Sequence, residues 1–315
     1  MIPLSASITK TESWQMELAH GFRSPRELLS YLELDALWDP GMEEAANHFP
    51  LRVPHYFAAL MTKGNPADPL LRQVLPVDDE LSLVPGFTMD PTGDQKARQG
   101  PGLLMKYHGR ALLLATGRCA INCRYCFRRH YPHADQQAHP GNWKPVLSTL
   151  RKDASFSEVI LSGGDPLLLS NSRLAGLIGE LERLPHLRRL RIHSRLPVVL
   201  PDRINATLVD ILANTRLKCA LVIHANHPLE LTPQLGRALA PLFKSGITLL
   251  NQSVLLRQVN DDPEIQTDLC ELLFDYNVLP YYLHLLDKVE GAARFEVPEY
   301  QAQEIYQHMR QQLPG

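Results

Sequence analysis

The chain has 315 residues, of which 44% are hydrophobic and 21% are charged, the composition of an ordinary globular protein. Its 32 basic and 34 acidic residues give a net charge of −2, without the basic excess of most nucleic-acid-binding proteins. The sequence has no run of about 18 apolar residues and no secretory signal at its start. We therefore expect a cytoplasmic protein that neither spans a membrane nor binds nucleic acid, built as two domains or one α/β barrel.

The first 100 residues predict a helical and irregular region. Ser24 followed by Pro25 and Glu27 is the pattern of a helix start, with Ser24 as the N-cap and Glu27 completing a capping box. Further helical segments are expected at 42–48 and 54–61.

A stretch dense in turn-forming residues, 85–102, separates this region from the rest of the chain. We therefore divide the chain into an N-terminal helical region at 1–100, a main domain at 101–297, and a C-terminal helical segment at 298–315.

From residue 111 onward, short apolar runs alternate with helical spacing at intervals of about 30 residues. The six runs lie at 111–116, 158–162, 190–194, 220–225, 248–256 and 281–286. This repetition predicts an α/β fold in which crossover helices join parallel strands. Six units are too few for an eight-fold barrel, so an open partial barrel and a doubly wound sheet both remain open.

In either architecture, catalytic residues are expected at the carboxyl ends of the parallel strands. Special or polar residues follow most of the predicted strands: a cysteine loop after the first, Gly163, Gly164 and Asp165 after the second, Arg195 after the third, Asn226 and His227 after the fourth, and Asp287 at the end of the sixth. This agreement between pattern and placement favours an enzyme.

Three of the five cysteines, Cys119, Cys123 and Cys126, form a CxxxCxxC motif. Three thiolates on one loop can bind three irons of a [4Fe–4S] cluster and leave the fourth iron open to an exogenous ligand. The alternative is a structural zinc site completed by His130 or His133, although such sites usually use paired CxxC spacings. The spacing favours the cluster, and a zinc-stabilised interaction domain stays as the non-enzymatic alternative.

The CxxxCxxC motif, with Tyr125 before its third cysteine, resembles the radical S-adenosylmethionine (SAM) superfamily, whose fold is a partial (β/α)6 barrel. Longer motifs narrow the resemblance to the lysine 2,3-aminomutase family: CRYCFRR at 123–129, LSGGDPL at 161–167, SRLPVVLP at 194–201, NQSVLL at 251–256, and Asn226-His227-Pro228. The resemblance covers about residues 100–300. It implies a radical SAM partial (β/α)6 barrel with an N-terminal helical region.

The resemblance also implies the ligands of the site. In this family three cysteines hold the [4Fe–4S] cluster, and SAM chelates the open iron. The positions matching the SAM contacts are Gly163, Gly164, Asp165, Arg195, His224 and Gln252. Without the resemblance, the glycines could form an ordinary βα turn, and His224 and Gln252 could be structural.

Substrate and pyridoxal 5′-phosphate (PLP) contacts are implied in the same way. Arg128 matches the position that binds the α-carboxylate of the substrate, and Asp287 the position that binds the lysine ε-ammonium. Tyr107 and Arg110 lie in the segment that approaches PLP. Taken alone, Arg128 could be a solvated or phosphate-facing arginine and Asp287 a helix cap.

One feature departs from the family. The aminomutases bind PLP as a Schiff base on a lysine in a glycine-rich C-terminal segment, and none of the lysines in this chain occupies that place. Because the substrate motifs are present, we expect this lysine, and a second carboxylate for the ε-ammonium, beyond residue 315. The alternative is that the protein does not use PLP.

The resemblance thus implies conversion of L-α-lysine into (R)-β-lysine with a [4Fe–4S] cluster, SAM, PLP and an electron donor such as flavodoxin or ferredoxin. The short N-terminal region and the run 129–132 resemble the bacterial branch that supplies β-lysine for elongation factor P through a lysyl-tRNA-synthetase-like ligase. The alternatives are a radical SAM aminomutase acting on another amino acid or on a protein-bound lysine, and an RNA-modifying enzyme, which the net charge disfavours.

Overall fold

The computed structural model describes residues 13–132 and 143–314. The N-terminal region contains short helices: α1 (Ser13–His20), α2 (Pro25–Tyr31), α3 (Pro40–His48), α4 (His55–Ala58) and α5 (Pro69–Arg72), with 3-10 turns at Asp35–Leu37 and Asp78–Leu81. The helices predicted at 42–48 and 54–61 are thus confirmed, the second in shortened form. None of the described helices is long and apolar enough to cross a membrane.

The main element is an eight-stranded sheet whose spatial order follows the chain, from β1 to β8. Its strands are β1 (Arg98–Gly100), β2 (Leu103–Tyr107), β3 (Arg110–Thr116), β4 (Glu158–Gly163), β5 (Arg189–Ser194), β6 (Lys218–His224), β7 (Thr248–Val254) and β8 (Leu279–His284). β1, β2 and β3 pair antiparallel, whereas β3 to β8 are all parallel. The six predicted parallel strands are therefore confirmed, with ends that differ by a few residues.

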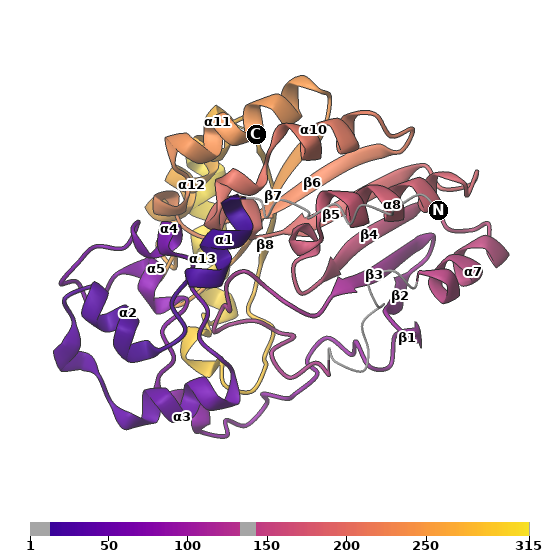
Figure 1. The fold of residues 1–315 in the computed structure, drawn as a ribbon. Helices are drawn as coiled ribbons and strands as arrows, with labels where there is room; N and C mark the ends of the chain where they lie inside the picture. Colours follow the sequence, from indigo (N-terminus) through magenta and orange to yellow (C-terminus); the bar gives the residue numbers. More distant parts are fainter. Residues whose placement is uncertain (1–12, 133–142, 315) are drawn as a thin grey trace, which may run out of the picture.

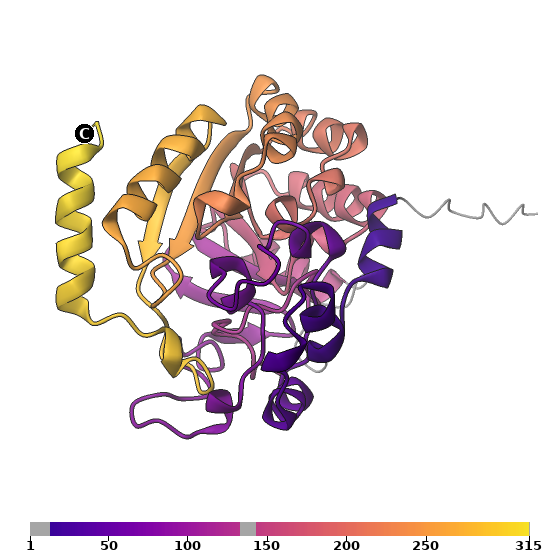
Figure 2. The same cartoon turned by 90° about the vertical axis from the view of Figure 1, so that its left-hand side faces the viewer.

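Helices connect the parallel strands: α7 (Lys144–Lys152), α8 (Asn171–Glu182), α9 (Leu196–Val199), α10 (Ala206–Ala213), α11 (Pro233–Lys244) and α12 (Pro263–Asp275), followed by α13 (Glu299–Gln312). A right-handed crossover between strands that always advance in one direction places every helix on the same face. Figures 1 and 2 show the helices along the outer face of the curved sheet. β1 and β8 are its two edges, so the barrel is open. This order confirms the partial barrel and excludes the doubly wound sheet, in which the order reverses.

One strand was not predicted, and one predicted capping box was wrong. The turn-rich stretch 85–102 contains β1, which forms a hairpin with β2 and extends the sheet by two antiparallel strands. Ser24 does precede α2 with extended backbone, but its side chain makes no capping hydrogen bond, so the capping box does not form. Short polar strands such as β1 carry little periodicity, and for this reason the sequence pattern missed it.

The faces of the sheet differ in chemistry. On β5 the buried Leu190 and Ile192 belong to the main hydrophobic cluster, while the alternating Arg191 and His193 are not part of it. Because successive strand residues point to opposite faces, the polar set faces the concave side of the sheet. The same cluster includes Leu28 of α2, so the N-terminal helices and the sheet share one core.

Candidate active site

The cysteine loop begins three residues after β3 and carries Cys119, Cys123 and Cys126, all partly buried. The backbone N–H of Cys126 donates to the carbonyl of Cys123 at 3.0 Å, which closes the loop into a tight turn. Burial and the neighbouring thiols raise the pKa of Cys119 well above its usual value and that of Cys126 to about 11. Deprotonation of these thiols therefore needs a positive ligand, such as the irons of a cluster.

Three thiols on one loop match the ligand set of a [4Fe–4S] cluster with one open iron. In residues 13–132 and 143–314, no three histidine, cysteine or acidic side chains come close enough to share one metal ion. A zinc ion would need its sulfurs about 2.3 Å from one centre, whereas a [4Fe–4S] cluster offers each cysteine its own iron. His130 hydrogen-bonds through Nε2 to the carbonyl of Glu290 at 3.1 Å, and His133 lies outside the described residues.

Two of the arginines in the motif hold the cysteine loop against the N-terminal region. Arg124 is fully buried, and its Nη2 pairs with Glu80 Oε2 at 2.6 Å. Arg129 pairs with the same oxygen at 2.7 Å. In addition, the carbonyl of Gln73 accepts from the backbone N–H of Arg124 at 2.9 Å. The N-terminal region is therefore part of the site, because it fixes the loop that carries the cysteines.

The glycines after β4 let two loops meet closely. Gly163 has a φ of +113°, and a Cβ at this position would lie 2.6 Å from the carbonyl oxygen of Thr116. A Cβ at Gly164 would overlap the backbone of Arg118, next to the first cysteine. The backbone N–H of Gly164 donates to Thr116 O at 2.7 Å. Both glycines thus pack the second loop against the cysteine loop, and contact with SAM stays a prediction.

Asp165 is buried, and each of its carboxylate oxygens accepts two hydrogen bonds. Oδ1 accepts from Leu167 N at 3.0 Å and Ser194 Oγ at 2.7 Å, and Oδ2 accepts from the backbone N–H groups of Arg195 and Leu196 at 2.9 and 2.8 Å. Burial still raises the pKa of Asp165, although these donors offset part of the rise. The side chain ties the loop after β4 to the end of β5, and its lone pairs are engaged by these donors.

Arg195 follows β5 and lies against the cysteine loop. Its Nη1 donates to Cys123 Sγ at 2.8 Å and also to the Tyr125 hydroxyl, and its Nη2 donates to Gln73 Oε1 at 2.8 Å. The same Nη2 forms an ion pair with Glu230 Oε2 at 3.2 Å. Nε of Arg195 is buried and has no hydrogen-bond partner among the described residues. An orphaned donor beside the cluster ligands is the kind of group that an anionic ligand would satisfy.

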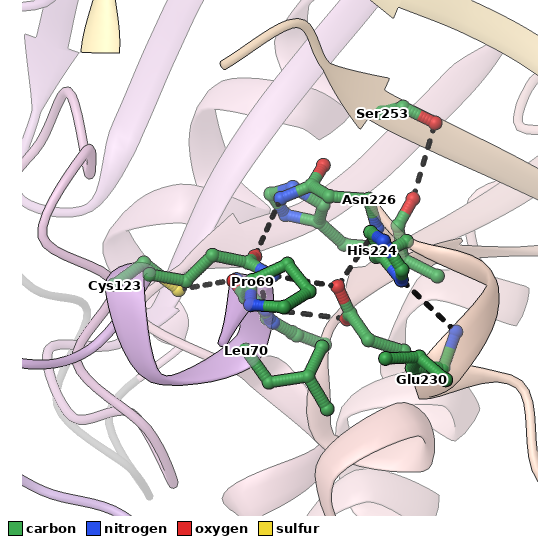
Figure 3. Close-up of polar contacts among 12 residues, drawn as sticks. Pro69, Leu70, Cys123, His224, Asn226, Glu230 and Ser253 are labelled. Atoms are coloured by element: carbon green, nitrogen blue, oxygen red, sulfur yellow. Dashed lines mark hydrogen bonds and ion pairs between the residues drawn. The ribbon is translucent and has the colours of Figure 1, made fainter. Parts of the chain in front are cut away.

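Asn226 completes this buried polar cluster from the loop after β6. Its Nδ2 donates to Tyr125 Oη at 2.6 Å and to Gln73 Oε1 at 2.9 Å, and its backbone N–H donates to Glu230 Oε1 at 3.1 Å. His224 lies at its edge, with Nε2 3.4 Å from the Tyr125 hydroxyl. Figure 3 shows Cys123, His224, Asn226 and Glu230 converging on this point from different elements.

The concave face of the sheet also carries histidines. Burial lowers the pKa of His193 to about 4, with Arg191 adding to the effect, and lowers the pKa of His224 well below its usual value. Both imidazoles are therefore neutral near pH 7. Gln252 lies beside His193, whose Nε2 is buried and unpartnered among the described residues.

Arg128 is engaged with Asp94, a residue that the sequence analysis did not single out. Its Nε donates to Asp94 Oδ2 at 2.6 Å and its Nη1 donates to Ser162 Oγ at 3.0 Å. Lys106 also pairs with Asp94. Burial alone would raise the pKa of Asp94, but Arg128 and Lys106 lower it. Arg128 is therefore held at Nε by Asp94 and at Nη1 by Ser162.

Asp287 lies in the loop after β8, three residues beyond the end of the strand, and not at its end as predicted. Its side chain is accessible to solvent. Partial desolvation raises its pKa, His284 and Lys106 offset part of the rise, and the charges of Asp94 and Arg128 also reach it. The structure thus brings Arg128 and Asp287 into one electrostatic neighbourhood.

Comparisons with known proteins agree with this geometry. Residues 99–188 match a family model described as a 4Fe-4S single cluster domain. The chain is 48% identical over 305 residues to the L-lysine 2,3-aminomutase of Escherichia coli, covering 96% of this chain and 89% of that protein. It is 42% identical to the enzyme of the same name from Haemophilus influenzae, covering 100% and 93%. It is 32% identical to that of Clostridium subterminale, covering 96% and 73%.

The chain belongs to the lysine 2,3-aminomutase family. It is therefore an isomerase of the radical SAM type that uses an iron–sulfur cluster and SAM. The cysteine loop lies within residues 99–188, and that it holds the cluster stays a prediction. The match to these relatives confirms the family predicted from the motifs.

The residues that the aminomutase resemblance places near PLP lie at the other end of β3. Tyr107 ends β2 and is exposed, and the guanidinium of Arg110 lies 4.7 Å from the centroid of its ring. Tyr281 lies on β8, the opposite edge strand of the sheet, and its Oη accepts a hydrogen bond from Nη1 of Arg191 on β5 at 3.0 Å. Exposed rings and guanidinium groups fit a planar, anionic cofactor.

Sequence reasoning missed the residues that support the predicted ones. Gln73, Glu80, Asp94 and Glu230 are all buried and hydrogen-bonded to a motif residue or ion-paired with one. No motif or periodic pattern in the sequence marks these four residues as functional. His193 sits two residues before a predicted site arginine, on a strand, and its alternation with Ile192 was the one available signal.

Proposed function

We propose that this chain isomerises L-α-lysine to (R)-β-lysine with a [4Fe–4S] cluster, SAM and PLP. The observation that carries the proposal is the placement of Arg128 and Asp287, opposite charges that influence each other, on the side of the sheet where the cysteine loop lies. An α-amino acid with a second ammonium group offers one carboxylate and one cation to such a pair. The names of its relatives support lysine as that amino acid.

The residues of the chain would bind and orient the reactants. Cys119, Cys123 and Cys126 would hold the cluster, while Gly163 and Gly164 keep the neighbouring loop close to it. When bound, the cluster, SAM and PLP supply the radical and amine-transfer chemistry.

On the substrate side, Arg128, already fixed by Asp94, would bind the substrate carboxylate, and Asp287 would bind its ε-ammonium. Neutral His193 and His224 would add no positive charge to that of the neighbouring Arg191 and Arg195.

The PLP site would lie at the start of β3. Tyr107 and Arg110 would bind PLP through a ring face and a guanidinium group, with Tyr281 on the opposite edge strand. Lys106, which precedes Tyr107 on β2, pairs with Asp94 and donates to Thr92 O at 2.9 Å. Lys106 is therefore committed to an ion pair, consistent with the expectation that another lysine anchors the cofactor.

We further propose that the product serves the modification of elongation factor P in the cytoplasm, through a lysyl-tRNA-synthetase-like ligase, with flavodoxin or ferredoxin as the electron donor. The motif resemblance of 129–132 and of the short N-terminal region supports this branch.

A lysine carried on a protein remains the second candidate substrate. Asp287 and Tyr282 are accessible to solvent, so a lysine on a bulky carrier protein could reach them from the open edge of the barrel.

The test uses anaerobically purified protein supplied with SAM, PLP, a reductant and either free L-lysine or lysine-containing elongation factor P. We expect about four irons and four sulfides per chain, PLP absorbance that depends on the added cofactor, and β-lysine from free lysine only. Iron and sulfide without PLP binding would overturn the aminomutation, and zinc without sulfide would overturn the radical chemistry. Conversion of only the protein-bound lysine would favour the second candidate.

A further inference from the structure

Arg195, Glu230 and Gln73 come from three separate parts of the chain and meet at the cysteine loop. Arg195 lies just after β5, Glu230 ends a 3-10 turn after β6, and Gln73 follows α5 of the N-terminal region. Glu230 and Gln73 are fully buried, and Arg195 is 6% exposed. Burying a charged side chain such as that of Arg195 or Glu230 lowers the stability of the fold unless the charge is paired.

The guanidinium group is held from one side and directed to a sulfur on the other. Glu230 Oε2 and Gln73 Oε1 accept from its Nη2 at 3.2 and 2.8 Å. Its Nη1 then donates to Cys123 Sγ at 2.8 Å. Gln73 Nε2 also donates to Glu230 Oε1 at 3.0 Å, so the two acceptors fix each other.

We propose that Arg195 sets the reduction potential of the cluster through its hydrogen bond to Cys123, and that Glu230 is a positioning residue that offsets the charge of Arg195. The inference rests on the assignment of Cys123 as a cluster ligand. Hydrogen bonds to cluster sulfurs and nearby net charge are the main means by which a protein tunes an iron–sulfur potential. A donor and a positive charge at the sulfur stabilise the reduced, more negative cluster, so Arg195 raises the potential and Glu230 limits the rise.

The two residues therefore predict shifts of opposite sign. Arg195→Gln removes the donor and the charge, so the cluster becomes harder to reduce. Glu230→Gln keeps the size of the side chain but removes its negative charge. Arg195 is still bound by Gln73 and by the Tyr125 hydroxyl in that variant, so it stays beside Cys123 with its charge unbalanced, and the cluster becomes easier to reduce.

The control is Arg203, a fully buried arginine in the 3-10 turn Pro201–Arg203, which follows β5 and α9. It donates to the carbonyls of Leu167 and Leu169 and to Asn171 Oδ1, and these contacts involve no cysteine. Arg203→Gln therefore measures what the loss of any buried arginine does to the fold and to cluster loading.

The experiment is an electrochemical titration of the reconstituted cluster, followed by electron paramagnetic resonance and without SAM, PLP or lysine. At a fixed applied potential, we expect Arg195→Gln to lower the ratio of reduced to oxidised cluster about tenfold. This corresponds to a reduction potential lower by about 59 mV for a one-electron couple. We expect Glu230→Gln to raise that ratio and Arg203→Gln to leave it unchanged. Iron and sulfide content is measured on every sample.

Unchanged ratios in Arg195→Gln and Glu230→Gln, with full clusters, would overturn the proposal. So would a fall in both, because Glu230 would then act only by holding Arg195 in place. If Arg195→Gln binds no cluster, Arg195→Lys and Glu230→Gln decide between the same outcomes. Aminomutase activity plays no part in the measurement, so a wrong substrate assignment would leave its result intact.

Discussion

Polar side chains are buried and paired at the carboxyl end of the sheet but exposed to solvent along its open edge. Around the cysteine loop, Gln73, Arg195 and Glu230 are buried, and hydrogen bonds and an ion pair join them. Along β8, in contrast, Tyr281 and Tyr282 are 38% and 42% exposed, although the strand belongs to the same sheet. In the first region the polar side chains bind one another, and only the Nε of Arg195 among those three residues lacks a partner in the described part of the chain, whereas the second region presents aromatic and ionisable groups to solvent.

This difference corresponds to two kinds of chemistry. Generating a radical requires a dry, fixed environment, because each buried charge must already have its partner before the cluster is reduced. Binding a polar substrate requires an accessible entrance and groups whose hydrogen bonds are not all satisfied. The cysteine-loop region has the first property and the region around Asp287 the second. Arg128 belongs to the cysteine loop and its charge reaches Asp287, so the two regions adjoin each other.

The largest expected effect is at the cysteine loop itself. If Cys123 holds one iron of the cluster, as proposed, Cys123→Ser removes that thiolate, so we expect loss of cluster absorbance and of all activity. Cys219→Ala is the matched control, because Cys219 is buried in the main hydrophobic cluster on the outer face of β6. Iron and sulfide analysis of both variants, purified anaerobically, makes the comparison. Equal cluster content in the two would contradict the assignment.

A second large effect is expected at Glu80, which is buried beside the cysteine loop. This carboxylate pairs with Arg124 and Arg129, and all three side chains are at most 3% exposed. Glu80→Gln leaves two buried guanidinium groups without a counter-charge, so we expect the free energy of unfolding to fall by about 3–5 kcal/mol. The measurement is denaturant unfolding of the cluster-free protein.

An exposed ion pair provides the contrast for Glu80. Lys63 and Glu33 pair at 3.0 Å with both side chains more than half exposed, so Glu33→Gln should leave the stability nearly unchanged. If the two variants lost similar stability, burial would not be what distinguishes the cysteine-loop region.

The sequence predicted the parallel strands and the cysteine loop for a physical reason. The six parallel strands are local, repetitive and apolar, so periodicity and turn signals revealed them. The three cysteines lie within eight residues, and their spacing alone restricts what they can bind. In both cases the information is contained in neighbouring residues.

The partners of the buried arginines could not be predicted in this way. Arg124, Arg128 and Arg195 pair with carboxylates that lie 44, 34 and 35 residues away along the chain. Their acceptors come from turns or irregular segments without periodicity, and only tertiary packing selects them. The expected strand-end position of Asp287 failed for a related reason, because strand ends depend on pairing with β7 and not on local composition.

A moderate, pH-dependent effect is expected at His193, on the concave face between the two regions. Its pKa is about 4 in the folded protein, lowered by burial and by Arg191, whereas an unfolded histidine has a pKa near 6.5. Below about pH 6.5 the unfolded chain therefore binds a proton that the folded chain does not, so stability falls as the pH drops from 6.5 towards 4. Between pH 7 and pH 5 this residue should remove about 2 kcal/mol.

His193→Gln should flatten that part of the pH dependence, measured as the free energy of unfolding at several pH values. The exposed His48 provides the control, since His48→Gln should leave the slope as it is in the unmodified protein. An unchanged slope in His193→Gln would show that His193 is not held neutral by its surroundings.

The smallest effect on function is expected at Asp287, in the solvent-accessible loop after β8. If it binds the ε-ammonium of lysine, Asp287→Asn removes a charge-assisted contact, and the partial exposure of the side chain places the loss at the low end of the range for such contacts. We expect the KM for L-lysine to rise about tenfold, or about 1.4 kcal/mol, with kcat less affected. The unfolding of the cluster-free protein should not change, because Asp287 has no ion pair among the described residues.

The decisive comparison for Asp287 uses 2-aminohexanoate, which has the carbon chain of lysine but no side-chain ammonium. An Asp287 that recognises the ammonium should matter for lysine and not for this analogue, so Asp287→Asn should bind the two ligands with more similar affinities than the unmodified protein does. An equal loss for both would mean that Asp287 shapes the loop after β8 instead of contacting substrate. The accessible edge of the barrel would then admit substrate without selecting it, and recognition of the substrate would depend on the contact of its carboxylate with Arg128.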